Sequence, residues 1–401
     1  MGVYLNPNAE AFRTSLRSAI YVDKSLLIGE INKLIGTEQK YICVSRPRRF
    51  GKSMAANMLA AYYSSMEKPE ELFEPLNVSQ HPSYREHLGQ YNVLKLNMQD
   101  FLSATATVEA MLQAIQHRLL GELHKEYGSL CSGENLIWDM EDIFAVTKKP
   151  FIILIDEWDC IFRDKKYTAE DQKKYLDFLR LWLKDKAYVA LAYMTGILPI
   201  KKYGTHSALN MFSEYSMTNS GPLAPYFGFT EAEVAALCQK HGMCFDEVQA
   251  WYDGYNLSYS SKNGRHSYSI YSPKSVVEAL LRHTLDTYWN QTETYEALRS
   301  YIIMDIAGLK KSIVEMLSGA KLPINIGTFV NDMSTFSCKD DILTLLVHLG
   351  YLSYDETDKT VALPNKEVAT EYLNAISTSQ WSEVNNDMVK SWKMLWEFKS
   401  K

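Results

Sequence analysis

Three consecutive residues, Gly51, Lys52 and Ser53, combine the groups that a bound triphosphate requires, and the apolar run YICVS (41–45) lies just before them. A phosphate site needs backbone N–H groups directed at the oxygens, a lysine for their charge and a hydroxyl for Mg²⁺. Gly51 would let the backbone approach the phosphates, Lys52 would reach the β and γ phosphates, and Ser53 would hold Mg²⁺. The sequence therefore predicts a loop for ATP and Mg²⁺ between a strand and a helix.

The loop departs from the usual GxxxxGK[ST] pattern, because Arg46 stands in place of the first glycine and Pro47 follows it. The groups that act on the phosphates are retained. A chance GKS at the start of a helix is the alternative that the loop alone leaves open. The residues expected to contact the nucleotide are Arg46, Pro47, Arg48, Arg49, Phe50, Gly51, Lys52, Ser53 and Met54.

A second motif, FIILIDEWD, places Asp156 and Glu157 at the end of the apolar run 151–156. Sheets of α/β proteins bind ligands at the carboxyl ends of their strands. Asp156 would hold Mg²⁺ through water, and Glu157 would polarise the attacking water. Either acid alone could be a solvated strand end, but both motifs in this order argue against that reading. Trp158 and Asp159 are expected in packing or in a surface turn.

A further strand, 188–196, ends in Thr195, which is a candidate sensor of the γ-phosphate or of the attacking water. The alternative is a threonine that merely ends a strand. Arg46, Arg48 and Arg49 crowd the loop, where one of them could add charge to the phosphates or act across a subunit interface as an arginine finger. Pairing of these arginines with nearby acids is an equally good interpretation.

Strands and helices alternate through the first half of the chain, which predicts a parallel sheet with right-handed crossovers. The segment 91–98 is strand-like and lies in the sequence between the loop strand and the acid strand. That extra strand, with the adjacent Glu157, favours an α/β P-loop NTPase of the additional-strand catalytic-glutamate type, with the sheet between layers of helices. The expected helices are 26–36, 53–64, 108–127 and 167–185, and the expected strands are 41–45, 91–98, 151–156 and 188–196.

From Phe229 onward the pattern predicts helices and loops. Thr230 and Glu233 form a capping box for a helix that stops at Gly242, and Ser272-Pro273 opens another helix. The stretch between them, 251–271, is expected to be a loop or a short hairpin. A helix over 340–350, a hairpin around 357–359 and a helix capped by Asn365 make a winged-helix pattern. The predicted parts are an ATPase core (1–215), a helical lid-like region (216–300), a winged-helix-like region (301–377) and a tail (378–401).

The composition excludes several classes of protein. With a formal net charge of −6 over 401 residues, the chain has no global basic footprint for nucleic acid or anionic membrane. No apolar run reaches the roughly 18 residues of a membrane span, and no signal peptide is visible. The six cysteines form no CxxC pair, and Cys43 and Cys160 are expected to be buried in a reducing compartment. A cytoplasmic location without a membrane partner is the expectation.

Several further motifs resemble the bacterial AAA-ATPase-like family over roughly residues 3–375. They are YVDKS (21–25), SRPRRFGKS (45–53), FIILIDEWD (151–159), MTGILPIKKY (194–203), FGFTEAEV (227–234), WYDGYN (251–256), YSPKSV (271–276), LLVHLGYLSYD (345–355) and LPNKE (363–367). The RPRR form of the loop is usual in that family. The resemblance implies an ATPase module that is typically followed by a PD-(D/E)XK nuclease domain. No ExK-type strand is found after residue 378, so nuclease activity is not expected from this chain.

The leading hypothesis is a Mg²⁺-dependent ATP hydrolase that acts as a nucleotide switch, with Glu157, Lys52 and Thr195 as its catalytic residues and with Ser53 and Asp156 at the metal. The alternatives are a weakly hydrolysing nucleotide-binding scaffold and a DNA-binding module that uses the winged helix. The expected ligands are ATP, ADP and Mg²⁺. DNA is a candidate partner through a missing or separate nuclease domain, and oligomerisation is left open.

Overall fold

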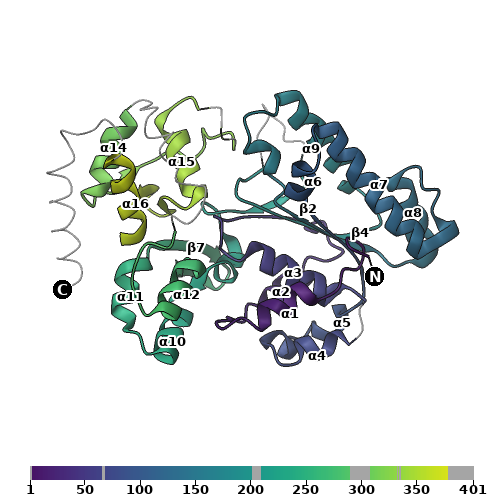
Figure 1. The fold of residues 1–401 in the computed structure, drawn as a ribbon, viewed down its shortest axis with the longest axis horizontal. Helices are drawn as coiled ribbons and strands as arrows, with labels where there is room; N and C mark the ends of the chain where they lie inside the picture. Colours follow the sequence, from purple (N-terminus) through teal and green to yellow (C-terminus); the bar gives the residue numbers. More distant parts are fainter. Residues whose placement is uncertain are drawn as a thin grey trace. The chain divides into compact units, whose positions relative to one another are not determined.

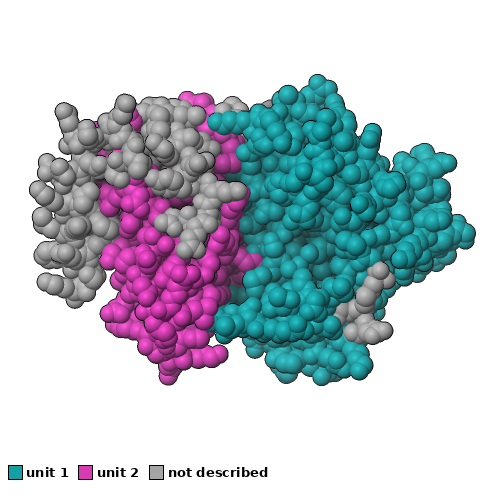
Figure 2. All heavy atoms as spheres, viewed as in Figure 1, with its two compact units in different colours: residues 1–45, 52–215 teal, residues 46–51, 216–401 magenta. Residues whose placement is uncertain are grey.

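A computed structural model describes residues 2–65, 68–200, 209–289, 308–331, 333 and 336–377 of the chain. The chain divides into two compact units, which are coloured separately in Figure 2. The first comprises Met1–Ser45 and Lys52–Tyr215, and the second comprises Arg46–Gly51 and Ser216–Lys401. The loop 46–51 is therefore grouped with the second unit, although both of its neighbours in the sequence belong to the first.

A five-stranded parallel sheet forms the centre of the first unit, in the order β2-β3-β4-β1-β5. Its strands are β1 (Tyr41–Ser45), β2 (Asn92–Asn97), β3 (Phe151–Asp156), β4 (Val189–Gly196) and β5 (Ser213–Tyr215). Every residue of β1, β3 and β4 is buried, as continuous apolar runs predict for the inner strands of a parallel sheet. The predicted α/β class is confirmed, and β5 is a strand that the sequence pattern did not predict.

The order of the sheet changes the assignment of the extra strand. The predicted strand 91–98 exists as β2, but β2 lies at the edge of the sheet beside β3. The strand that separates β1 from β3 is β4, which pairs in parallel with both of them. The additional strand is therefore 189–196, because sequence order does not determine spatial order in a sheet.

Helices cover both faces of this sheet, with α1, α2 and α3 on one face and α6, α7 and α9 on the other (Figure 1). The helix predicted over 26–36 ends early, at Asn32, while that over 108–127 has the predicted bounds. Thr168 caps the helix that was predicted over 167–185, so that helix begins at Ala169. The helices are α1 (Glu10–Leu16), α2 (Leu26–Asn32), α3 (Lys52–Tyr63), α4 (Pro69–Phe73), α5 (Tyr84–His87), α6 (Met98–Ser103), α7 (Val108–Tyr127), α8 (Leu136–Thr147) and α9 (Ala169–Leu183), with short 3₁₀ turns η1 (Asn77–Gln80), η2 (Gly128–Leu130) and η3 (Cys160–Phe162).

The second unit contains more strand than its sequence pattern suggested. The stretch 251–271 includes a long antiparallel hairpin of β7 (Tyr255–Ser261) and β8 (Gly264–Tyr271), and β6 (Phe229–Thr230) pairs with β8. The predicted capping box at Thr230 is confirmed, as is the left-handed helix stop at Gly242. The surrounding elements are η4 (Gly221–Tyr226), α10 (Glu231–His241), α11 (Phe245–Tyr252) and α12 (Pro273–Arg282).

The carboxyl-terminal part of this unit has the predicted order of helix, hairpin and helix. It comprises α14 (Leu309–Leu317), β9 (Leu322–Pro323), α15 (Lys339–Leu349), β10 (Ser353–Asp355), β11 (Thr360–Ala362) and α16 (Lys366–Ser377), and its sheet has the order β10-β11-β9. The Asn365 side chain accepts from Val368 N at 2.9 Å, as a cap should. The segment predicted as a tail, 378–401, lies outside the described residues.

No helix in the described part of the chain is long and apolar enough to cross a membrane.

Candidate nucleotide site

Asp156 is the last residue of β3, and neighbouring groups fix one of its carboxylate oxygens. The Thr195 hydroxyl, on β4, donates a hydrogen bond to Asp156 Oδ1, and the backbone N of Glu157 donates to the same atom at 3.0 Å. Trp158 N donates to Thr195 O at 3.0 Å, which ties the turn after β3 to the end of β4. The parallel pairing thus joins the two strand ends that the sequence singled out separately.

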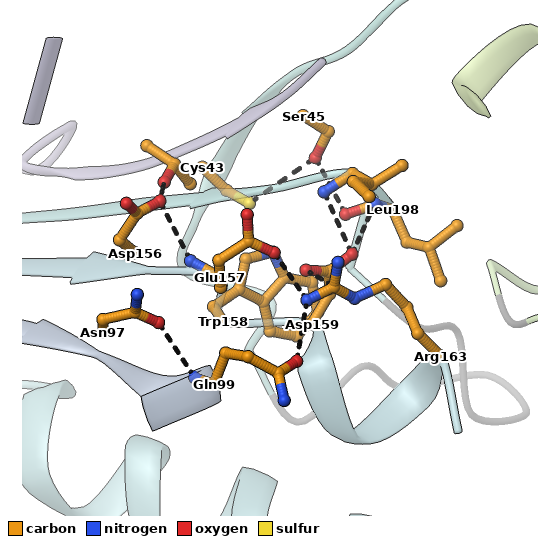
Figure 3. A network of polar contacts seen from close by, with 12 residues as sticks. Cys43, Ser45, Asn97, Gln99, Asp156, Glu157, Trp158, Asp159, Arg163 and Leu198 are labelled. Carbon is orange, nitrogen blue, oxygen red and sulfur yellow. Dashed lines mark hydrogen bonds and ion pairs between the residues drawn. The ribbon is translucent and has the colours of Figure 1, made fainter. Parts of the chain in front are cut away.

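Glu157 begins the turn after β3 with a φ of 54°, a value that few residues other than glycine adopt. Its carboxylate Oε2 lies 2.5 Å from Nη2 of Arg163, a residue that follows η3 (Figure 3). The Arg163 side chain is 12% exposed and that of Glu157 is 23% exposed, so the ion pair lies at the margin of the buried network. Sequence reasoning did not predict this contact.

Asp159 is buried in a hydrogen-bond network, so the surface-turn interpretation of this residue is wrong. Its Oδ2 accepts from Ile197 N at 3.0 Å and from Leu198 N at 2.8 Å, and its Oδ1 lies 3.7 Å from Arg163 Nε. Trp158 is also fully buried, in agreement with the packing interpretation. The acid at 159 and the arginine four residues later were visible in the sequence as a spacing that brings side chains together in one helical turn.

Gly196 completes this turn, because there is no room for a side chain at its position. A Cβ there would lie 2.7 Å from Trp158 Nε1 and 2.8 Å from Asp159 Oδ1. Both of those side chains are fully buried. A glycine at the end of β4 therefore allows the turn after β3 to pack against β4.

Lys52, the first residue of α3, lies in the electrostatic field of these acids. It is only 5% exposed, and this burial lowers its pKa, while the carboxylates of Glu157, Asp156 and Asp159 act in the opposite direction. The structure therefore brings the predicted lysine and the predicted acid pair together within the first unit. Ser53 and Met54 follow it on the first turn of α3, where both are exposed.

The loop 46–51 has the backbone conformation of a turn that requires glycine. Gly51 has a φ of 88° and Arg49 a φ of 68°. No heavy atom lies within 4 Å of the place where a Cβ on Gly51 would be, so the cost of a substitution there would come from the backbone conformation. The role of Gly51 toward phosphates stays a prediction.

Aromatic residues of the second unit enclose the loop. Phe50 is 1% exposed, and its ring meets those of Tyr255 and Trp289 edge-on, with centroids 5.5 and 6.3 Å apart. Its carbonyl accepts from Gly228 N at 3.1 Å. The Arg46 guanidinium, also buried, lies 5.6 Å from the centroid of the Phe227 ring. The apolar parts of the loop thus serve as core residues of the second unit.

The three loop arginines differ in exposure, and the difference bears on their predicted roles. Arg46 is buried, Arg48 is half-buried and Arg49 is exposed. Pro47 packs closely on Gly350, where a Cβ would lie 2.9 Å from the Pro47 ring. Of the three arginines, Arg49 is therefore the best placed to reach a group outside the chain.

The donor set at Asp156 suits Mg²⁺ bound together with a nucleotide. Within the described residues no three His, Cys, Asp or Glu side chains form a metal-binding group. Mg²⁺ is usually held by one or two protein oxygens together with phosphates and water, so a larger protein cage is not required. The hydrogen bonds from Thr195 and from Glu157 N both go to Asp156 Oδ1, and the other oxygen of this carboxylate, Oδ2, could serve as such a ligand.

A comparison of the sequence with known families finds a match to the amino-terminal part of the chain. Residues 10–205 match the family model of the predicted AAA-ATPases. This match confirms the resemblance that the motifs indicated, over a segment that holds β1, α3, β3 and β4.

One curated relative comes from Azotobacter chroococcum, where it is described as an uncharacterized protein in the vnfD 5′ region. It is 28% identical over 293 residues, which are 68% of this chain and 51% of the relative. This chain thus spans about half the length of that relative.

Two solved structures are similar over most of the chain at low identity. A Walker-type ATPase of Pyrococcus abyssi has a TM-score of 0.41 at 12% identity and covers 87% of this chain and 94% of its own. The ORC2 protein of Aeropyrum pernix has a TM-score of 0.36 at 12% identity, with coverages of 92% and 93%.

Proposed function

We propose that this protein is a Mg²⁺-dependent ATP hydrolase whose nucleotide state is communicated to its second unit. The observation that carries the proposal is that Lys52, at the start of α3, lies in the field of Asp156 and Glu157, at the carboxyl end of β3. Ligands of open parallel sheets bind at this edge. The family match over 10–205 supports the same conclusion.

Each residue of the cluster has a role that its surroundings support. Lys52 would neutralise the β and γ phosphates, and Asp156 and Ser53 would hold Mg²⁺, whose charge would stabilise the transferring phosphoryl group. The Thr195 hydroxyl, which donates to Asp156, would orient the Asp156 carboxylate toward the metal. In a different rotamer the same hydroxyl would contact the γ-phosphate and so sense it. Gly51 and the loop before it would supply backbone N–H groups for the phosphates.

Glu157 would act as the general base. It would accept a proton from a water molecule, while the water oxygen forms a bond to the γ-phosphorus. The bond from that phosphorus to the bridging oxygen breaks, and its electron pair leaves with ADP. The position of Glu157 at the tip of β3, directly after Asp156, supports this role.

The packing of the loop supports a role as a switch. Phe50 and Arg46 belong to the loop that would hold the phosphates, and both are core residues of the second unit. A change in the loop on nucleotide binding would therefore disturb the contacts with Tyr255, Trp289 and Phe227 directly. We propose that the region 216–377 responds to the nucleotide in this way, and that in longer relatives the response reaches a nuclease domain, as the family resemblance implies.

Phosphate release by the wild type, by Glu157→Gln and by Glu170→Gln tests hydrolysis. Loss of the base should lower kcat by about 10²- to 10⁴-fold. Glu170 is an exposed acid on α9, and its replacement should leave kcat within about two-fold. Equal rates for the wild type and Glu157→Gln would favour the weakly hydrolysing scaffold instead.

Calorimetric titration with MgATP tests binding separately from hydrolysis. Lys52→Ala should weaken binding about 100-fold or more, because a buried charge partner of the phosphates is lost. Glu157→Gln should bind MgATP as tightly as the wild type. If the calorimeter detects no binding of MgATP to the wild type, the proposal is wrong.

The winged-helix-like segment gives little support to direct recognition of DNA by α15. Every residue from Asp341 to Leu349 on this helix is buried, whereas a recognition helix must present side chains to a groove. DNA binding by another surface is open to a gel-shift experiment at two salt concentrations, since contacts to phosphates weaken steeply with salt.

A further inference from the structure

We propose that Arg163 is a positioning residue that holds Glu157 in the orientation needed to take a proton from water. This inference rests on the proposed hydrolase function and adds to it a residue that neither the motifs nor the family match indicates. It starts from the ion pair between Arg163 Nη2 and Glu157 Oε2, at 2.5 Å (Figure 3).

The ion pair engages one carboxylate oxygen and leaves the other open. Glu157 Oε2 is a buried atom that faces the guanidinium. Glu157 Oε1 is not the oxygen of this ion pair, and it belongs to a side chain that keeps 23% of its surface exposed. A carboxylate gripped at one oxygen presents the other in a fixed direction, which is how a base is oriented by a third group in other hydrolases.

Arg163 is itself fixed from behind. Its Nε lies 3.7 Å from Asp159 Oδ1, and Asp159 Oδ2 accepts from Ile197 N and Leu198 N, directly after β4. Although burial works against it, the carboxylates of Asp159 and Glu157 raise the pKa of Arg163, so the guanidinium remains charged. Gln99 Oε1, from α6, accepts from Nη2 at 3.5 Å and limits the movement of the side chain on another side.

Residues at the end of β4 therefore help to orient both Asp156 and Glu157. Thr195 sets Asp156 through a hydroxyl, and the backbone after Gly196 sets Glu157 through Asp159 and Arg163. Two cations, Lys52 and Arg163, balance part of the charge of three carboxylates in this cluster. The two acids can thus be adjacent in sequence without repelling each other out of place.

A double-mutant cycle tests the proposal, with kcat for MgATP and the Kd for MgATP measured for each protein. Arg163→Met should lower kcat about 10- to 100-fold, the cost of misplacing a catalytic group by about 1 Å, and should change Kd by less than about three-fold. Arg163→Lys should restore part of the loss. In a Glu157→Gln background, Arg163→Met should lower kcat by less than about two-fold, because the group that it positions is gone.

Controls separate positioning from folding. Arg163→Met leaves Asp159 as a buried charge without its cation, so Arg163→Met/Asp159→Asn is made beside it; Asn keeps an oxygen for Ile197 N and Leu198 N. This double variant should have a Tm close to that of the wild type and should still show the low kcat. Arg180→Met, an exposed arginine on α9, should leave kcat unchanged.

Two outcomes overturn the inference while leaving the hydrolase in place. One is an unchanged kcat in Arg163→Met, and the other is an equal fold-loss in the wild-type and Glu157→Gln backgrounds. A wild type that releases no phosphate overturns the proposed function itself, and is therefore distinct from both.

Discussion

The two parts of the proposed nucleotide site are held by different forces. Asp156 and Glu157, at the end of β3, are fixed by short polar contacts within the first unit, through Thr195, Asp159 and Arg163. The loop 46–51 is fixed by aromatic packing within the second unit, around Phe50. Polar contacts fix the orientation of a functional group, whereas apolar packing fixes the position of a backbone segment.

This difference suggests a division of labour. Catalytic atoms must be held in a fixed orientation, because a small misalignment lowers the reaction rate strongly. A phosphate-binding loop acts through backbone N–H groups, which move as a unit with the chain. Since the packing that holds the loop belongs to the second unit, we expect changes in that packing to alter nucleotide affinity. The following predictions test this contrast.

The largest effect is expected at Phe50. Phe50→Ala should lower the free energy of unfolding by about 3 to 5 kcal/mol, because it empties a buried site among Tyr255 and Trp289. MgATP affinity should fall as well, since the loop loses its support. Urea unfolding and calorimetric titration measure the two effects.

Met54 is the matched control for that experiment, because it lies four residues on and is 45% exposed. Met54→Ala should change the unfolding free energy by less than about 0.5 kcal/mol. If both variants are equally stable, aromatic packing does not hold the loop.

A pH-dependent effect is expected at Glu367, which supports the aromatic packing around the loop 46–51. Its Oε1 accepts from Tyr288 N at 2.7 Å and from Trp289 N at 2.9 Å, and Trp289 packs on Phe50. Burial raises the pKa of Glu367 from 4.5 to about 7. The native state therefore keeps the proton between these values while the unfolded chain loses it, and stability falls as the pH rises through that window.

Replacement by glutamine removes this titration while keeping an acceptor for both N–H groups. The wild type should lose about 2 to 3 kcal/mol between pH 4.5 and pH 8 through this group, and Glu367→Gln should lack that loss. Chemical unfolding across this range measures it, with the exposed Glu247→Gln as the control. A pH profile that is the same in Glu367→Gln and the wild type would contradict the assignment.

The smallest effect is expected at Thr195, one of the residues whose polar contacts fix the acids of the first unit. Thr195→Val keeps the shape but removes the hydroxyl that donates to Asp156, at a cost of about 1 to 2 kcal/mol in stability. The Mg²⁺ concentration for half-maximal ATPase activity should rise, because a proposed metal ligand loses its orientation.

Thr195→Ser, which keeps the hydroxyl, should retain the wild-type dependence on Mg²⁺. Thr147→Val, at an exposed helix end, is the control for stability. If valine at 195 leaves the Mg²⁺ dependence unchanged, the Thr195 hydroxyl has no part in the orientation of the metal ligand.

Local patterns were sufficient for most of the elements. The apolar run 151–156 became β3, and the capping residues Thr230 and Asn365 start helices where expected. These features depend on neighbours in the sequence, whose side chains and backbone meet at short range. The short β5 gave no such pattern, because three residues carry too little periodicity to predict a strand.

The sequence by itself determined which groups are available for chemistry: the glycine, lysine and hydroxyl at 51–53 and the acids at 156 and 157. Only the tertiary structure decided how they are supported. It inserted β4 between β1 and β3, placed Arg163 against Glu157, and gave the loop 46–51 to the second unit. The strand order and the grouping of the loop depend on contacts between residues far apart in the chain, which the pattern of one sequence does not encode locally. The Arg163–Glu157 pair depends on the turn after β3, with its positive φ at Glu157, which no local pattern indicated.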